Sequence, residues 1–126
     1  MCPFCDPARR KDELLSTEHF FVIADRAPVV RGHALVISKR HVESLLELTP
    51  AEWEDYHAAL RTTLLYLDRV CQPDGYCMGN NKGRAAGQTV FHFHEHIFPR
   101  YKGDVDDPRG GIRNFTKPLR QLWPDE

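Results

Sequence analysis

The chain has 126 residues with 17 Lys and Arg against 18 Asp and Glu, so its formal net charge is −1. This length suits one domain with its own core. A content of 41% apolar and 28% charged residues is typical of a soluble globular chain. The small net charge argues against binding a nucleic acid polymer. No apolar run approaches the roughly 20 residues that span a bilayer, and the first residues do not resemble a signal peptide. We therefore expect a cytoplasmic protein with a single domain, 1–126, that binds no membrane.

Two short strands are predicted in the first third of the chain. The run 19–24 is rich in aromatic and β-branched residues, 25–28 is typical of a turn, and 33–38 has the composition of a second strand. We expect the two strands to pair as a hairpin, followed by one or two helical turns in 42–48.

A long helix is predicted to begin at Thr49. Thr49 can cap its N-terminus, Pro50 suits the first helical position, and Glu52 completes a capping box. Pro73 and the residues after it end the helix. Apolar or amphipathic residues recur along it at helical spacing, which predicts that this stripe faces a sheet: Trp53, Tyr56, Leu60, Leu64, Leu67 and Cys71.

The second half of the chain predicts two further strands, 75–80 and 88–99, separated by a glycine-bounded loop at 81–87. From about residue 101 the sequence has the composition of a C-terminal tail. The order of two strands, a helix and two strands favours an antiparallel α+β domain over a doubly wound one.

Three histidines, His92, His94 and His96, alternate along the last predicted strand. On a strand they share one face, with neighbours about 7 Å apart and the outer pair about 13 Å apart. Two neighbouring imidazoles can converge on one small group. The spacing leaves three interpretations open: a solvated row on an edge strand, a zinc site, and phosphoryl transfer with one imidazole as nucleophile and the next as proton donor.

The loop before these histidines favours phosphate chemistry. Gly87, Gln88 and Thr89 supply backbone N–H groups, an amide and a hydroxyl, while Lys82 and Arg84 add positive charge. Small polar donors beside a row of imidazoles suit a phosphate chain better than a water bound to zinc.

Cys2 and Cys5 form a C-x-x-C motif at the start of the chain. Without a secretory signal, metal ligation or redox use is favoured over a disulfide framework. A redox motif is expected between a strand and a helix, whereas this one precedes a charged stretch. We therefore rank metal ligation first.

Two blocks of the sequence resemble the histidine triad nucleotide hydrolases and transferases. One block runs from Asp25 to His41 through the run Gly32-His33-x-Leu-Val-Ile, and the other runs from Asn81 to His96 and ends in Gly-Gln-Thr-Val-x-His-x-His-x-His. The resemblance covers 20–100. It implies an α+β fold with a five-stranded antiparallel sheet and one long helix, a homodimer, and hydrolysis at the α-phosphate of a nucleotide.

The resemblance also implies a role for each matched residue. His94 would be the nucleophile that forms a nucleotidyl-histidine intermediate, His96 would assist the leaving group, and His33 would lie beside the same site. Asp25 would accept hydrogen bonds from the ribose hydroxyls. The remaining matched positions contact phosphate or the leaving group: Asn81, Gln88 and Thr89.

The third histidine bears on the class of reaction. Transferase and phosphorylase branches resemble H-x-H-x-Q, so His96 favours water as the acceptor and hence hydrolysis. The sequence is most similar to the fragile histidine triad branch, which cleaves dinucleoside polyphosphates; a Mg²⁺ carried by such a substrate is compatible with chemistry at His94. The alternatives are a nucleoside phosphoramidate hydrolase, a nucleotide-binding protein without turnover, and a zinc hydrolase that uses the histidine row as ligands.

Some members of this family hold a structural zinc ion near the N-terminus. The matching positions here are Cys2, Cys5, His41 and His92. A closed tetrahedron of these ligands would tie the N-terminus to the sheet and orient His92.

Glu95 departs from the family pattern, which has an apolar residue on the strand face opposite the histidines. We expect either that this face is partly exposed at Glu95 or that the carboxylate has a cationic partner.

Overall fold

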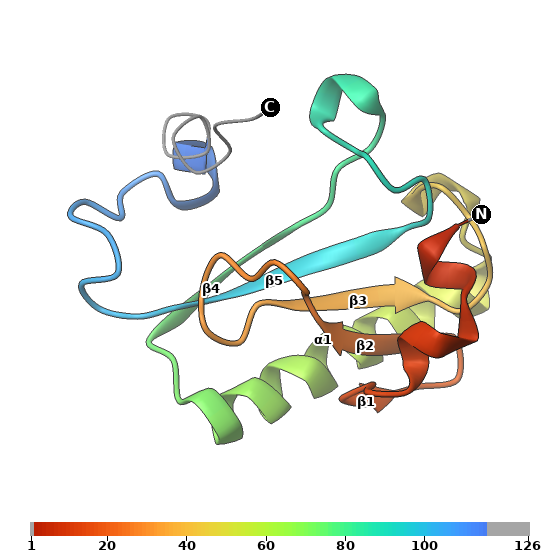
Figure 1. The fold of residues 1–126 in the computed structure, drawn as a ribbon, viewed down its shortest axis with the longest axis horizontal. Helices are drawn as coiled ribbons and strands as arrows, with labels where there is room; N and C mark the ends of the chain where they lie inside the picture. The colour runs from red at the N-terminus through yellow and green to blue at the C-terminus, as the bar shows by residue number, and fades with distance from the viewer. Residues whose placement is uncertain (1, 116–126) are drawn as a thin grey trace.

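The computed structural model describes residues 2–115 (Figure 1). Met1 and the end of the expected tail, residues 116–126, lie outside the described residues. Within the described part, five strands form one antiparallel sheet in the order β1-β2-β3-β5-β4. The strands are β1 (Leu15–Ser16), β2 (Phe20–Ala24), β3 (Ala34–Ser38), β4 (Gly75–Gly79) and β5 (His94–Arg100), and the helix α1 spans Pro50–Cys71. Short 3₁₀ turns lie at Pro3–Cys5, Pro7–Arg10, Leu45–Glu47, Arg84–Ala86 and Gly111–Phe115.

The predicted hairpin is confirmed, because β2 and β3 pair antiparallel from Phe20 opposite Ser38 to Ala24 opposite Ala34. The strand β5 lies between β3 and β4, so the last strand in the sequence occupies the interior of the sheet. The α+β class and the five antiparallel strands are also confirmed. The two-residue strand β1, which pairs with β2 at the sheet edge, was not predicted.

The capping box of α1 is confirmed: the Glu52 N–H donates to the Thr49 hydroxyl, and the Thr49 N–H donates to the Glu52 carboxylate at 2.8 Å. The predicted stripe is partly wrong, because the Trp53 side chain lies outside the core and the residue is 40% exposed. The buried side of the helix includes small residues at its centre, which let the helix approach the sheet closely. That side consists of Glu52, Tyr56, Ala59, Thr63 and Leu67.

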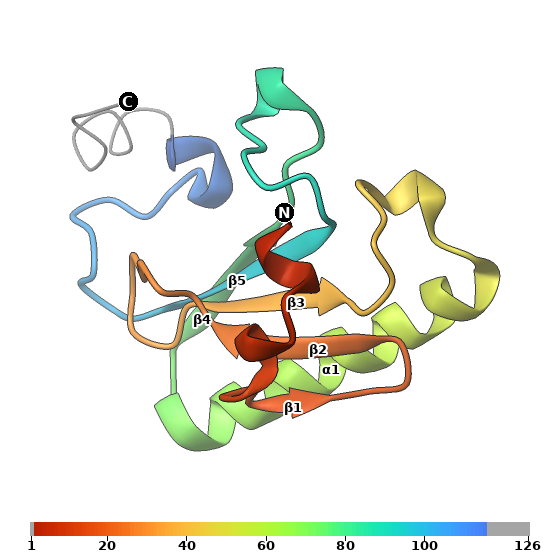
Figure 2. The same cartoon turned by 45° about the vertical axis from the view of Figure 1, so that its right-hand side comes forward.

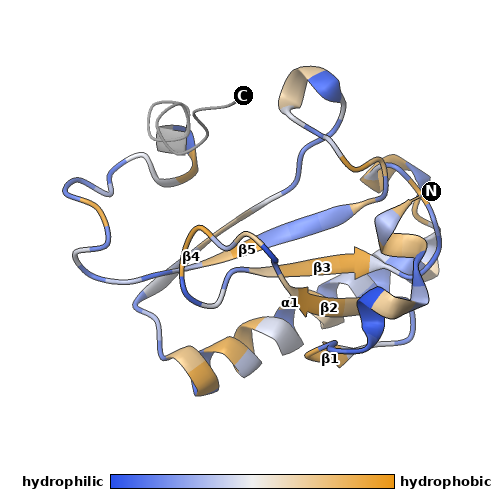
Figure 3. Cartoon of the chain, viewed as in Figure 1, coloured by the Kyte–Doolittle hydropathy of each residue, from blue (hydrophilic) through white to orange (hydrophobic). Residues whose placement is uncertain are grey.

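The sheet lies between α1 and the N-terminal segment (Figures 1 and 2), with an apolar layer on each face. α1 covers one face, where Tyr56, Ala59 and Leu67 pack with sheet residues such as Val36 and Ile97. The N-terminal 3₁₀ turns lie over the other face. There the buried Phe4 packs against the following sheet residues: Phe21, Ile23, Leu35 and Ile37. Figure 3 shows that β2 and β3 are hydrophobic along their length, whereas much of β5 is hydrophilic.

The predicted strand at 88–99 begins later than expected, at His94. Before that residue the chain also bonds to the segment after β3. The Phe93 N–H donates to the Val42 carbonyl at 2.6 Å, and Nε2 of the Gln88 side chain donates to the Glu43 carbonyl at 3.1 Å. His92 therefore precedes the strand, although its ring lies on the same side of the sheet as the ring of His94, since the Phe4 ring contacts both. Among residues 2–115, no helix is long and apolar enough to cross a membrane.

Candidate functional site

The site is built on β5, where side chains alternate between the two faces of the sheet. His94, His96 and Phe98 are half-buried on the face opposite α1, whereas Glu95 and Ile97 are buried on the helix side. His94 and His96 lie opposite Ile37 and Leu35 of β3, so the rigid interior of the sheet fixes their backbone. Their ring centroids are 5.2 Å apart.

The protonation of His94 is set by its main-chain partner. Nδ1 of His94 lies 2.8 Å from the carbonyl oxygen of His92. A carbonyl only accepts hydrogen bonds, so Nδ1 carries the proton and Nε2 of the neutral ring carries a lone pair. Burial lowers the pKa of His94, partly opposed by this hydrogen bond and by the carboxylates of Asp25 and Glu95. His94 is thus a neutral imidazole at neutral pH, with Nε2 as its nucleophilic atom.

His96 and His33 form a hydrogen-bonded pair across β5 and β3. The Val29 N–H donates to Nδ1 of the buried His33 at 3.3 Å, which places the proton of the neutral His33 ring on Nε2. Nε2 of His33 lies 2.9 Å from Nδ1 of His96, so His96 accepts there and keeps its own proton on Nε2. Burial and the neighbouring His94 and His33 lower the pKa of His96 to about 4.

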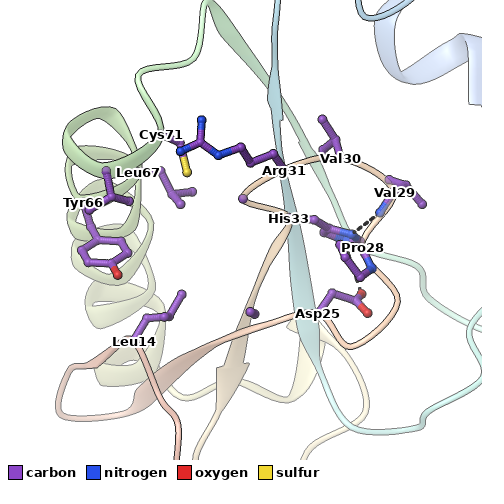
Figure 4. A pocket seen from close by; sticks show the side chains of 13 residues that line it. Leu14, Asp25, Pro28, Val29, Val30, Arg31, His33, Tyr66, Leu67 and Cys71 are labelled. Atoms are coloured by element: carbon purple, nitrogen blue, oxygen red, sulfur yellow. Dashed lines mark hydrogen bonds and ion pairs between the residues drawn. The ribbon is translucent and has the colours of Figure 1, made fainter.

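Asp25 lies at the end of β2, beside the His33 ring (Figure 4). Its Oδ1 accepts from the Ala27 N–H at 2.9 Å, and its Oδ2 lies 3.4 Å from Nε2 of His33. The carboxylate opposes the lowering of the pKa of His33 that burial causes. Asp25, with a side chain that is 20% exposed, is therefore the acidic group of this site that solvent reaches.

A cavity of about 460 Å³ lies beside Asp25 and His33, between the loop that joins β2 to β3 and the C-terminal half of α1. In Figure 4 the Arg31 side chain crosses it towards Cys71, and Tyr66 and Leu67 border it from the helix. The cavity is thus continuous with the carboxylate and one imidazole of the site.

A second cluster brings together the four residues that the sequence predicts as metal ligands. The ligand atoms of Cys2, Cys5, His41 and His92 all lie within 4.8 Å of one another. The Cys2 Sγ lies 3.3 Å from Nδ1 of His92, the Cys5 Sγ lies 3.3 Å from Nδ1 of His41, and the two Nδ1 atoms are 3.1 Å apart.

A tetrahedral zinc ion, with bonds of about 2.3 Å to sulfur and about 2.0 Å to nitrogen, sets its ligands roughly 3.3–3.8 Å apart. The two distances from sulfur to nitrogen lie in this range, and the two Nδ1 atoms would need to separate by only about 0.2 Å. The orientation of His92 fits as well. Its Nε2–H donates to the Ser38 carbonyl at 2.7 Å, which leaves the Nδ1 lone pair for a metal.

The loop residues predicted to contact phosphate lie in different settings. The Gln88 side chain is buried and holds the loop together: Oε1 accepts from the Gly83 N–H at 2.8 Å, and Nε2 donates to the carbonyls of Glu43 and Val90. Asn81 and Thr89 are exposed. Thr89 borders a hollow of about 420 Å³ shared with Cys2 and His41, on the side of the second cluster.

Phe4 is a site residue that sequence reasoning missed. Its ring centroid lies 5.0 Å from that of His94 and 5.9 Å from that of His92. It therefore links the cysteine cluster to the candidate nucleophile. An aromatic residue between two cysteines carries no signal of such a contact, which depends on the folded N-terminus.

Both expectations for Glu95 are wrong. The residue is only 6% exposed, and its partners are neutral rather than cationic. The Asn80 amide donates to Oε1 of Glu95 at 2.8 Å. On the helix side, burial and then the charge and hydrogen bond of Glu95 raise the pKa of Tyr56.

The chain is similar in sequence to known proteins of one family. The family model described as "HIT domain" matches residues 8–103. The chain is 41% identical over 88 residues to "Protein hit" of Bacillus subtilis, a match that covers 69% of this chain and 61% of that protein. It is 33% identical over 99 residues to the bis(5'-adenosyl)-triphosphatase of Dictyostelium discoideum, with coverage of 79% and 66%.

Solved structures of histidine triad proteins have a similar fold. A hypothetical histidine triad nucleotide-binding protein from Sulfolobus tokodaii superposes with a TM-score of 0.75 at 35% identity, covering 84% of this chain and 73% of that one.

Proposed function

The chain belongs to the HIT family, and on this premise we propose that it hydrolyses nucleoside 5′-phosphoryl compounds at the α-phosphate through a covalent intermediate on His94. One observation carries the proposal. The hydrogen bond from His94 Nδ1 to the His92 carbonyl leaves Nε2 as a nucleophile on the face opposite α1, beside His96.

The proposed reaction has two displacements. In the first, the lone pair of His94 Nε2 forms a bond to the α-phosphorus, and the bond from phosphorus to the leaving oxygen breaks with its electron pair on that oxygen. The Nε2–H of His96 donates a hydrogen bond to this developing charge. In the second, water adds its oxygen to phosphorus, the P–N bond breaks back to a neutral His94, and the proton of the water passes to solvent.

The substrate class we propose is the dinucleoside polyphosphates, with nucleoside phosphoramidates as the alternative. The similarity to a bis(5'-adenosyl)-triphosphatase supports the first class. Asp25 would bind the ribose hydroxyls through its solvent-reachable carboxylate, while Asn81, Thr89 and the backbone N–H groups near Gln88 would bind phosphate. A direct side-chain contact from Gln88 would require it to exchange the loop bonds it now makes.

We further propose that Cys2, Cys5, His41 and His92 hold a structural zinc ion, because their spacing and the free Nδ1 of His92 fit one. Zinc with four protein ligands supplies a cross-link and no open position. These residues would fix the N-terminal segment over the sheet.

We also propose that the protein is a homodimer. The edge strand β4 and the outer side of α1 carry half-exposed apolar side chains such as Met78 and Leu65, which a second copy of the chain would cover. Sedimentation equilibrium tests this, and a monomer at micromolar concentration would contradict it.

The hydrolysis proposal is tested with diadenosine triphosphate, diadenosine tetraphosphate and adenosine phosphoramidate as substrates for the wild type, His94→Ala and His57→Ala. His57 is an exposed histidine of α1 and serves as the matched control. We expect AMP release to fall by about 10³-fold or more in His94→Ala only. Equal rates in the wild type and His94→Ala would overturn the mechanism, and mononucleotide binding without turnover would favour a binding protein. The relative rates on the three substrates identify the branch.

A rapid alkaline quench tests the intermediate directly, because a phosphorus–nitrogen bond to histidine survives alkali and is lost in acid. Mass spectrometry should place one nucleotidyl group on the peptide that contains His94. Absence of the adduct at every quench time during a single turnover would indicate direct attack by water.

A further inference from the structure

The carboxylate of Asp25 and the imidazoles of His33 and His96 converge at one point of the site. Their ligand atoms lie within 4.8 Å of one another, with Nε2 of His33 2.9 Å from Nδ1 of His96 and 3.4 Å from Oδ2 of Asp25. Two imidazoles and one carboxylate form a typical ligand set for a divalent first-row transition metal.

We propose that Asp25, His33 and His96 form a second metal site, which takes a divalent transition metal such as Zn²⁺ or Co²⁺ in place of the nucleotide. The site differs in chemistry from the cluster around Cys2, since it has no thiolate. Metal binding here does not depend on the proposed function; only the inhibition that follows from it does.

The geometry of the ligands fits such an ion. Bonds of about 2.0–2.2 Å to nitrogen and oxygen place tetrahedral ligands roughly 3.3–3.5 Å apart. His33 and Asp25 already have this spacing at 3.4 Å, and His33 and His96 need to separate by only a few tenths of an ångström from 2.9 Å. The three residues are held by the end of β2, the residue before β3, and β5, so the sheet preorganises them.

The ring protons determine how tightly the metal binds. His96 already presents a lone pair at Nδ1, because it accepts there from His33. His33 has to free its Nε2, which moves its proton to Nδ1 and breaks the hydrogen bond from the Val29 N–H. We therefore expect weaker binding here than at the cysteine cluster, so that a metal fills the two sites in sequence.

The cavity beside the site gives a metal ion access to its ligands, and the proposed nucleotide contacts explain why metal and nucleotide would compete. Asp25 and His33 border the 460 Å³ cavity, and Figure 4 shows the Asp25 carboxylate beside the His33 ring there. Three protein ligands leave a fourth position for water or an anion. A nucleotide bound as proposed needs Asp25 for its ribose and His96 for its leaving group, so metal and nucleotide exclude each other.

Metal stoichiometry by equilibrium dialysis with Zn²⁺ is the test. We expect two equivalents per wild-type chain, one of which is lost in Cys2→Ser/Cys5→Ser. In that double variant, Asp25→Asn should weaken the remaining equivalent at least 10-fold, whereas the control Asp106→Asn, at an exposed carboxylate, should leave it unchanged. AMP should raise the apparent Kd of this equivalent and not that of the cysteine cluster.

Co²⁺ provides an independent readout. Thiolate-to-cobalt charge-transfer absorption should appear with the first equivalent and not with the second. The proposal is overturned if the wild type binds only one equivalent, or if the second equivalent is insensitive to both Asp25→Asn and AMP. Because these measurements need no turnover, an inactive protein that binds two metals would contradict the proposed hydrolysis and leave the second site intact.

Discussion

The rings of Phe4 and His94 meet edge to face, with centroids 5.0 Å apart and planes inclined at 71°. Phe4 stands between Cys2 and Cys5 in the sequence, and both cysteines lie beside the ring of His92. The N-terminal segment therefore packs on the candidate nucleophile.

The first prediction concerns the cysteine cluster. We expect Cys2→Ser/Cys5→Ser to lose the zinc equivalent of the cysteine cluster and to hydrolyse nucleotides roughly 10-fold more slowly, since ligands that orient a neighbouring group typically contribute 10- to 100-fold. Metal analysis and AMP release measure the two effects. Cys77→Ser is the matched control, because Cys77 lies outside the cluster on β4. A double variant that binds as many equivalents of zinc as the wild type would contradict the ligand assignment.

The second prediction concerns Phe4 itself. The residue is 7% exposed and closes the apolar layer opposite α1, so Phe4→Ala leaves a cavity and we expect it to lower the free energy of unfolding by about 3 kcal/mol. Phe4→Leu keeps most of the volume and should cost less than half of that, while still losing the edge contact with His94. Urea unfolding measures the stability loss of each variant. Equal stability of Phe4→Ala and the wild type would show that the N-terminal segment does not pack as described.

The third prediction tests the buried carboxylate of Glu95. Glu95→Leu removes the acceptor of the Asn80 amide and of the Tyr56 hydroxyl, and we expect a loss of about 2 kcal/mol of stability. Glu95→Gln keeps an oxygen for Asn80 and should be affected less. Chemical denaturation of both variants is the measurement. A Glu95→Leu protein more stable than the wild type would mean that the carboxylate is a net cost to folding, retained for another reason.

The fourth prediction is a pH dependence of stability. The Arg40 guanidinium donates two hydrogen bonds to Glu52, and together with the Thr49 N–H it lowers the pKa of Glu52 to about 2. Because the pKa in the folded state is lower than the ordinary value of 4.5, the unfolded state takes up the proton first as the pH falls. The stabilisation is therefore complete above about pH 5 and is lost towards pH 2.

We expect Glu52→Gln to lower the free energy of unfolding at neutral pH by about 1–2 kcal/mol, a range reduced because the Arg40 side chain is half exposed to solvent. The difference between Glu52→Gln and the wild type should shrink as the pH approaches 2. A difference that stays constant across this range would mean that packing, and not the charge, carries the effect.

The features that could be predicted from the sequence are those that neighbouring residues determine. The hairpin of β2 and β3, the capping box at Thr49 and the placement of His94 and His96 on one face all follow from local composition and alternation. The two-residue β1 could not, because it exists only as a partner of β2.

The features that differ from the sequence predictions depend on contacts between residues that are distant in the sequence. The strand β5 begins later than the sequence predicts because the Phe93 N–H bonds to the Val42 carbonyl, which is remote in the sequence. The buried side of α1 includes Glu52 because Arg40, outside the helix, compensates its charge. The contacts of Phe4 and Glu95 depend in the same way on distant segments. The cytoplasmic location and the residue roles stay predictions.

Three histidines, His92 of the cysteine cluster and His94 and His33 of the candidate active site, each have one ring nitrogen bonded to the main chain. His92 bonds to the Ser38 carbonyl, His94 to the His92 carbonyl, and His33 to the Val29 N–H. Every amino acid except proline offers the same carbonyl and amide groups, so substitutions at the bonding positions leave these partners in place. The side chains that line the cavity are thus free to vary in shape and charge while the pattern of ring protons persists. A protein engineer who reshapes the pocket for a new leaving group would keep a nucleophile that is already set in its reactive tautomer.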